Sequence, residues 1–260
     1  MIGLNNMGNC HFEGLTIADS SNHALNTLFG QDSSRKWWKQ IGWRANTDMG
    51  NLPGLTEDCF FRIQDDGLYV CGQNFRRNTL WFDCNGSPFR GSFILRGAYG
   101  AGQQTLVEDC DIIYTRSNWG GEVISAGDHW ESGTYPDGTM NTGQHLIFRN
   151  IRVTDPRPTR ALFALSAPKD LDVGFAGIRF ENVEFRHPHS WGRKSSFVGR
   201  AKAPISYLYF DRVFIEGKKM DAALLSNSFN TSSISNFVFR DAPIMKPLPE
   251  AKREQGAGPD

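Results

Sequence analysis

One short sequence phrase recurs along the chain and limits the folds that the chain can adopt. Each copy has an apolar residue, one or two polar residues, Asn or Asp, and then a β-branched or aromatic run. Aligned on the Asn/Asp place, neighbouring copies mostly lie roughly 20 to 40 residues apart. The widest early gap has room for a further turn of chain, RKWWKQIGWRANTD. The copies are FEGLTI from Phe12 (with Gly in the Asn/Asp place), LTEDCFFRI from Leu55, FRRNTLWF from Phe75, LVEDCDIIY from Leu106, LIFRNIRV from Leu146, IRFENVEF from Ile178, LYFDRVFI from Leu208 and ISNFVFRD from Ile234.

Irregular repeats of this period are typical of a β-solenoid. One coil cannot bury its apolar face alone, whereas coils stacked about 4.8 Å apart share a core and pair their backbone groups. Asn suits a recurrent bend because it tolerates left-handed backbone and its amide can bond to the next copy. A β-sandwich is the alternative, but it needs frequent hairpin turns, and Asn-Gly and Asp-Gly pairs are few. We therefore predict an all-β chain that forms a right-handed single-stranded parallel β-helix.

The organisation of the chain follows from where this pattern starts and stops. Strand-like sequence begins at once, so we expect residues 1–242 to form the β-helix and to lack its first coils at the N-terminus. Residues 243–260, PIMKPLPEAKREQGAGPD, are rich in Pro, Gly and charge and have no apolar period. We expect this tail to be disordered or loosely packed.

The composition excludes several classes of function. The chain has 28 Lys and Arg residues and 28 Asp and Glu residues, so it lacks the excess of basic residues that nucleic-acid-binding proteins normally have. No apolar run approaches the length of a membrane span. We find no Cys-x-x-Cys pair or clustered His, and expect neither a metal site nor a cofactor. Cys59 and Cys110 occupy matching places in two copies, which predicts buried, unpaired thiols. We expect a monomer.

Candidate chemistry lies in WRANTDMG (Trp43 to Gly50) and in the segment that contains Asp65 and Asp66. Asp48 precedes the Asp pair by about 17 residues, close to one coil of a small β-helix. Residues one coil apart stack on one face, so the three carboxylates should crowd together and raise at least one pKa. Glycosidic cleavage needs such a pairing of a protonated acid with an ionised base. Each motif alone is common at turns, and only the combination favours catalysis.

Two families of polysaccharide hydrolase share these motifs. The pectin-degrading β-helix hydrolases (polygalacturonase-like, family 28) have Asn-Thr-Asp followed one coil later by Asp-Asp, but also Gly-His-Gly and Arg-Ile-Lys motifs that this chain lacks. The chain more closely resembles glycoside hydrolase family 49, the dextranase and isopullulanase family. The resemblance covers roughly half of the chain. It lies in GLTIADSSNHALN (Gly14 to Asn26), WRANTDMG, DCFFRIQDDGLYV (Asp58 to Val70), RRNTLWFDCNGSPF (Arg76 to Phe89) and LVEDCDIIYTRSNW (Leu106 to Trp119).

The resemblance implies a pectin-lyase-like solenoid, a role for each carboxylate and inversion at the anomeric carbon. By that resemblance Asp65 is the general acid, and Asp48 and Asp66 position and deprotonate the water. The chain departs from the family pattern at Met49, which separates Asp48 from Gly50 where the family has Asp-Gly directly. We expect the chain to be a fragment, without the N-terminal β-sandwich that the family has.

Substrate contacts are expected from aromatic and polar residues close to these coils. Trp43, Trp81, Trp37 and Trp38 are candidate sugar platforms, and at most one of the adjacent pair Trp37 and Trp38 should be in the core, because neighbours on a strand face opposite sides. The polar and loop candidates each have a separate rationale. Asn46 lies two residues before Asp48 and would share its face on a strand, and Arg90 follows in the next coil. We expect Trp119 to lie in a loop that walls the cleft.

These residues lead to a predicted function with two alternatives. We expect an inverting glycoside hydrolase that acts on a glucan or dextran-like polysaccharide. Secretion to the extracellular space follows only from the size of such a substrate. A non-catalytic carbohydrate-binding solenoid is one alternative. A polysaccharide lyase or epimerase is the other, although the carboxylate coil offers only Arg62 to neutralise a uronate.

Overall fold

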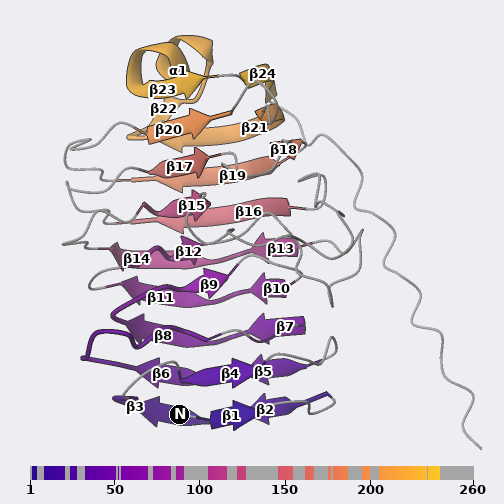
Figure 1. The fold of residues 1–260 in the computed structure, drawn as a ribbon. Helices are drawn as coiled ribbons and strands as arrows, with labels where there is room; N and C mark the ends of the chain where they lie inside the picture. Colours follow the sequence, from indigo (N-terminus) through magenta and orange to yellow (C-terminus); the bar gives the residue numbers. More distant parts are fainter. Residues whose placement is uncertain are drawn as a thin grey trace, which may run out of the picture.

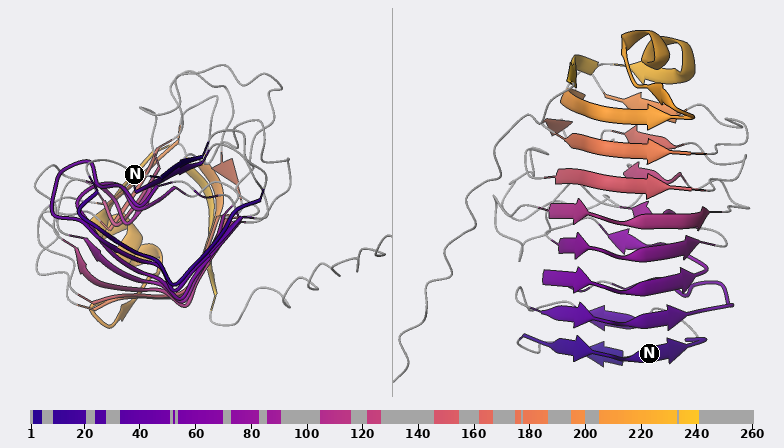
Figure 2. Two further views of the ribbon diagram at one scale, coloured as in Figure 1. Left: turned by 90° about the horizontal axis from the view of Figure 1, so that it is seen from below. Right: turned by 180° about the vertical axis from the view of Figure 1, so that it is seen from behind.

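The computed structural model shows a stack of parallel β-strands that turn through three walls per coil (Figures 1 and 2). The parallel β-helix predicted from the repeat is confirmed. The structure describes residues 2–4, 9–20, 24–27, 33–50, 52, 54–69, 73–82, 86–90, 105–115, 122–126, 146–154, 162–166, 175–176, 178–186, 195–199, 205–232 and 234–240. The predicted tail, residues 243–260, lies outside the described residues.

Two of the walls belong to one bent sheet. The first wall contains β2 (His11–Glu13), β5 (Ser34–Lys36), β7 (Gly54–Glu57), β10 (Gln73–Arg76) and β13 (Thr105–Glu108). The second contains β3 (Thr16–Ala18), β6 (Lys39–Ile41), β8 (Phe60–Ile63), β11 (Thr79–Phe82) and β14 (Asp111–Thr115). Three longer strands cross the corner and serve both walls: β16 (Leu146–Val153), β19 (Arg179–Phe185) and β21 (Ile205–Ile215).

The third wall is a separate parallel sheet, and short elements complete the stack. This wall contains β9 (Leu68–Tyr69), β12 (Phe89–Arg90), β15 (Ile124–Ala126), β17 (Phe163–Ser166), β20 (Ser195–Val198) and β23 (Phe229–Ser232). The remaining strands are β1 (Ile2–Leu4), β4 (Leu25–Thr27), β18 (Phe175–Ala176), β22 (Lys218–Lys219) and β24 (Ile234–Arg240). The helix α1 (Ala222–Ser228) lies at the C-terminal end of the described stack (Figure 1). It begins at Asp221, whose carboxylate accepts a hydrogen bond from the Leu224 N–H at 2.7 Å.

The corner between the first two walls is one residue in the left-handed region, which turns the strand without breaking the stack. The predicted Asn/Asp bend is confirmed in four copies, where the corner residue is Asp58, Asp109, Asn150 or Asn182. The Asn182 amide donates to the Asn150 side chain, and the Asn150 amide donates to Asp109, each at 2.8 Å. The remaining corners are Gly14, Trp37, Arg77 and Arg212.

The alignment on Asn or Asp is wrong by one position in two copies. In FRRNTLWF the corner is Arg77, and Asn78 follows it inside the coil, where its side chain bonds to the Cys59 N–H and the Thr56 carbonyl. In LYFDRVFI the corner is Arg212 rather than Asp211. An internal Asn that ties two coils together looks the same in the sequence as an Asn at the bend.

The core is a set of side-chain columns that run along the stack. In the first wall the inward position is Phe12, Arg35, Thr56, Phe75, Val107, Phe148, Phe180, Phe210 and Phe239 in successive coils. The rings of Phe148 and Phe180 stack with centroids 5.4 Å apart, as do those of Phe180 and Phe210. Full burial of each such ring contributes roughly 1.5–3 kcal/mol relative to an exposed one.

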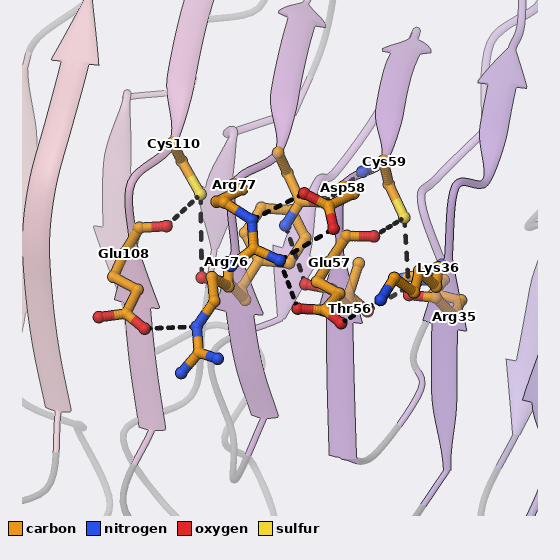
Figure 3. A network of polar contacts seen from close by, with 12 residues as sticks. Arg35, Lys36, Thr56, Glu57, Asp58, Cys59, Arg76, Arg77, Glu108 and Cys110 are labelled. Atoms are coloured by element: carbon orange, nitrogen blue, oxygen red, sulfur yellow. Dashed lines mark hydrogen bonds and ion pairs between the residues drawn. The ribbon is translucent and has the colours of Figure 1, made fainter.

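The two repeat cysteines behave as predicted. Cys59 and Cys110 are buried and free, and each follows a corner residue. Each Sγ points to backbone carbonyls, that of Cys59 to Arg35 and that of Cys110 to Phe75 (Figure 3). Burial raises the pKa of both thiols, that of Cys110 to about 12, so both are protonated at neutral pH. In the described part of the chain, no helix has the length and apolarity needed to cross a membrane.

Candidate active site

Coil stacking brings the three predicted aspartates into one cluster. Asp48 lies in the segment that follows β6, and Asp65 and Asp66 lie between β8 and β9, one coil further on. One carboxylate oxygen from each of the three residues lies within 4.8 Å of the other two. The prediction that Asp48 stands beside the Asp65-Asp66 pair is therefore confirmed by the structure.

Hydrogen bonds hold together the two loops of the site, the one that follows β6 and contains Asp48 and the one between β8 and β9 that contains the Asp65-Asp66 doublet. The Thr47 hydroxyl donates to the Arg44 carbonyl at 2.9 Å and accepts from the Gln64 N–H at 3.1 Å, so it joins the two loops directly. The Met49 N–H donates to the Asp66 carbonyl at 3.0 Å. These bonds fix the two loops in a register that places Asp48 beside the pair.

The next coil presses against the doublet from the other side. A Cβ on Gly86 would stand 2.3 Å from the Asp66 nitrogen, so only glycine fits at this position. The Ser87 N–H donates to Asp66 Oδ1 at 3.2 Å, and the Gly67 N–H donates to the Ser87 carbonyl at 2.9 Å. The site is thus built from three successive coils.

The three carboxyl groups differ in how much of their surface is exposed to solvent. Asp48 and Asp66 are buried, with 6% and 3% of their surface exposed, whereas Asp65 is half-buried. The pKa of Asp65 is raised to about 6, mainly by burial and secondly by repulsion from Asp48 and Asp66. Hydrogen bonds from the backbone N–H groups of Asp66 and Asn46 lower the pKa and offset part of this effect. Asp65 can therefore carry a proton close to neutral pH.

The same oxygens could also hold a divalent cation, because carboxylates at this spacing can share one ion. The raised pKa of Asp65 belongs to the cluster without a cation, because a bound cation would favour the ionised carboxylate and lower this pKa. The arrangement offers one proton donor, Asp65, beside two further carboxyl groups, and acid–base hydrolysis needs groups of this kind.

Aromatic rings and one guanidinium, that of Arg62, lie on the outer face of the second wall, and Arg62 precedes Asp65 by three residues in the chain. Register pairs Trp81 with Arg62 on one side and Tyr114 on the other. The Arg62 guanidinium lies 5.3 Å from the Trp43 ring centre and 6.0 Å from that of Trp81, and it donates to the Gly42 carbonyl at 2.8 Å. Trp43 is 58% exposed and Trp81 38% exposed, so both present surface to solvent.

Several predictions about individual site residues need correction or lie beyond the described structure. Asn46 does not share a strand face with Asp48: it is an exposed turn residue with a φ of 61°, and it contacts Asp65 through its backbone N–H. The described part of Arg90 is its backbone in β12, and its side chain lies outside the described structure. Trp119 also lies outside the described residues.

The adjacent tryptophans divide as predicted, although they form a corner rather than part of a strand. Trp38 is fully buried, and Trp37 is 52% exposed with a φ of 52°. The Lys36 ammonium lies 5.0 Å from the Trp37 ring centre. Trp37 stands at the corner between β5 and β6, whereas the aspartates follow the ends of β6 and β8, so this ring belongs to a different part of the surface.

Sequence reasoning missed the residues that act through their position in a neighbouring coil. Thr47 and Gly86 were part of recognised motifs without an assigned role, and Arg62 was considered only as a charge. Alignment of the copies on their corner residues would have placed Arg62 and Trp81 in one column, whereas Tyr114 joins this column through a register shift between Leu80 and Trp81. In comparisons with known proteins, no family model and no curated sequence matches this chain.

Proposed function

We propose that this chain is a glycoside hydrolase that cleaves a polysaccharide with Asp65 as general acid and with Asp48 and Asp66 as the groups that hold and deprotonate water. The observation that carries the proposal is the half-buried Asp65, whose pKa is raised to about 6 beside two buried carboxylates. The resemblance of the motifs to glycoside hydrolase family 49 supports the same assignment of roles.

The proposed reaction uses each carboxyl group once. Asp65 transfers its proton to the glycosidic oxygen while the bond from that oxygen to the anomeric carbon breaks, and the leaving sugar departs as an alcohol. A water molecule held by Asp48 and Asp66 attacks the anomeric carbon and gives its proton to one of these carboxylates. The products are two shorter glycans, and proton exchange with solvent restores the protonated Asp65.

The stereochemical outcome has two candidates. The family resemblance supports inversion, for which the acid and base are ordinarily about 6.5–9.5 Å apart. The 4.8 Å bound on the oxygen separations is shorter and favours a retaining mechanism, in which the carboxyl groups are about 5–5.5 Å apart. The 4.8 Å bound refers to selected oxygens, so the carboxyl carbons can be farther apart. We propose inversion, and the anomeric configuration of the first product, read by proton NMR, decides between the two.

We propose a neutral glucan as the substrate class. Because such a substrate is a large polymer, we also propose that the protein acts outside the cell. The exposed rings of Trp43 and Trp81 offer apolar faces for sugar rings. Arg62, the cation between these rings, already donates to the Gly42 carbonyl, which supports a neutral substrate over a uronate. A lyase would instead release an unsaturated product that absorbs ultraviolet light.

The test is reducing-sugar release from dextran, pullulan, starch, xylan and pectin. Asp65→Asn is expected to lower the rate by roughly 10²- to 10⁴-fold, because it keeps the shape of the site and removes the acid. Asp58→Asn is the matched control, since Asp58 is a corner carboxylate at a place where Asn150 and Asn182 serve in other coils. It should leave the rate unchanged.

Either of two results would contradict hydrolysis by this cluster. One is an Asp65→Asn protein as active as the wild type on the cleaved substrate. The other is a wild-type protein that binds one of these polysaccharides but cleaves none of them, which would support the carbohydrate-binding alternative. An ultraviolet-absorbing product would support the lyase.

A further inference from the structure

The coil that carries Asp48 has a polar inward residue in each of the first two walls, Arg35 and Gln40. In the first wall the inward column is phenylalanine or valine in the other coils except at Arg35 and Thr56. In the second wall the inward column is Ile17, Gln40, Phe61, Leu80 and Ile112 in successive coils, so Gln40 alone is polar among these. Arg35 and Gln40 belong to the same coil and flank the corner at Trp37 and Trp38.

Both side chains are buried and both bond to the segment that carries the aspartate. Gln40 is 1% exposed, and its Nε2 donates to the Asp48 carbonyl at 2.8 Å. Arg35 is fully buried, and its Nη1 donates to the Met49 carbonyl at 2.9 Å. Two consecutive carbonyls of this segment are therefore held from inside the solenoid by two side chains of one coil.

The arrangement is expensive in stability. Arg35 has no carboxylate within ion-pair distance among the described residues; its Nε donates to the Thr56 hydroxyl at 2.9 Å, and its guanidinium lies 5.0 Å from the Phe61 ring centre. Its Nη2 and the Gln40 Oε1 are buried without a hydrogen-bond partner in the described structure. Burial lowers the pKa of Arg35 to about 10, so the side chain remains a cation at neutral pH. Natural sequences keep such costs mainly where function needs them.

We propose that Arg35 and Gln40 are positioning residues that fix the Asp48 carboxylate against Asp65 and Asp66 by holding the Met49 and Asp48 carbonyls from the interior. At the end of this segment the backbone passes close to β4, because Gly50 adopts a φ of 81° and a Cβ there would stand 1.9 Å from the Leu25 carbonyl oxygen. This inference rests on the proposed function for its consequence, and on the hydrogen bonds alone for its geometry. Met49, the residue that departs from the family motif, then has a local role: its carbonyl is the acceptor for Arg35.

The test compares Arg35→Met and Gln40→Leu with the wild type on the cleaved polysaccharide. Both variants introduce an apolar side chain of similar length, which most other coils have at these places (Thr56 is the exception), so the melting temperature should stay within a few degrees of the wild type. The kcat should fall roughly 10- to 100-fold while the KM changes less than about twofold, because the substrate surface is untouched and one carboxylate is misplaced. Arg35→Lys retains a cation that can reach a carbonyl and should recover part of the kcat.

Phe148→Leu is the matched control, since Phe148 occupies the same inward column far from the site. It should lower the melting temperature and leave kcat unchanged. Crystal structures of Gln40→Leu and of the wild type provide a readout that needs no substrate, and the Asp48 carboxylate should move away from Asp65 while the neighbouring strands stay in place. If the wild type cleaves nothing but the carboxylate moves, the proposed function fails and the positioning role stands.

Three outcomes would overturn the positioning role. The first is a variant that unfolds or melts far below the wild type, which would make the two side chains structural. The second is a stable variant with wild-type kcat. The third is an Asp48 carboxylate that keeps its place in the Gln40→Leu crystal structure.

Discussion

Unusual residues in this protein are identified most clearly when each is compared with the residues at the equivalent position in other coils. Trp37 stands where other coils have Gly14, Asp58, Asn150 or Asn182, and a bulky side chain with a φ of 52° is unusual there. Arg35 stands in a column that is otherwise phenylalanine except at Thr56 and Val107. In both cases the departure from the column is visible only after the register of the coils is known.

The burial of Asp65 and its repulsion by Asp48 and Asp66 predict a pH-dependent change in stability. The folded-state pKa of Asp65 is about 6 and its ordinary value is 3.8, so its contribution to stability is complete below about pH 4 and is lost as the pH rises through 6. Asp65→Asn should therefore melt roughly 2–4 °C higher than the wild type at pH 8, or about 1 kcal/mol after allowance for solvent screening. The difference should vanish at pH 4. A gain that is the same at both pH values would contradict this account, and calorimetric melting curves at the two values measure it.

The two exposed tryptophans should differ in their effect on substrate binding. Trp43→Ala is expected to raise the KM several-fold, because Trp43 lies beside Arg62 close to the cluster. Trp37→Asn places a residue used at other corners and should leave the KM unchanged while raising the free energy of unfolding by about 1 kcal/mol through relief of backbone strain. The measurements are steady-state kinetics and denaturant unfolding. Equal effects of both variants on the KM would show that the sugar contacts extend to the corner.

The sequence predicted the site residues whose reasoning depended on coil spacing and failed where it assumed a local conformation. Asp48, Asp65 and Asp66 were brought together correctly because a spacing of one coil needs no knowledge of the loops. Asn46 was placed wrongly because strand alternation was assumed in a segment that is a left-handed turn. Nothing in the local sequence around Gln40 distinguishes an inward side chain from an outward one.

At the scale of the strands, the outer face of the first wall carries a ladder of alternating charge (Figure 3). The ladder is Lys36, Glu57, Arg76, Glu108, Arg149 and Glu181 in successive coils. Lys36 and Glu57 are 3.2 Å apart, and Arg149 and Glu181 are 2.8 Å apart. Parallel strands place identical repeat positions side by side, so a repeated charge would repel itself, and alternation avoids this.

A charge reversal in the middle of this ladder should be destabilising and salt-sensitive. Glu108→Lys would place three cations in a row with Arg76 and Arg149, and we expect a loss of about 1 kcal/mol at low salt. High salt should reduce the loss, because these side chains are partly exposed and are screened. Glu216→Lys, at an exposed turn outside the ladder, is the control and should be neutral. A loss for Glu108→Lys that does not respond to salt would point to packing rather than charge.

At the scale of the whole molecule, the stack converts distances along the chain into short distances in space. The site draws on the coil of Asp48, the coil of Asp65 and Asp66, and the coil of Gly86 and Ser87. The repeat was sufficient to predict this architecture, because a solenoid is determined by its period and its apolar positions. The loops between the coils carry no such period, so their conformations could not be predicted in the same way.

The central claim is that stacking makes the three aspartates one electrostatic unit, and carbon NMR titration of the Asp65 carboxyl group tests it directly. The wild type should give a pKa of about 6 for Asp65. Asp48→Asn should lower that value toward 3.8, since it removes one of the two neighbouring charges and keeps the side-chain shape. An Asp65 that titrates near 4 in the wild type, or whose pKa is unaffected by Asp48→Asn, would contradict the claim.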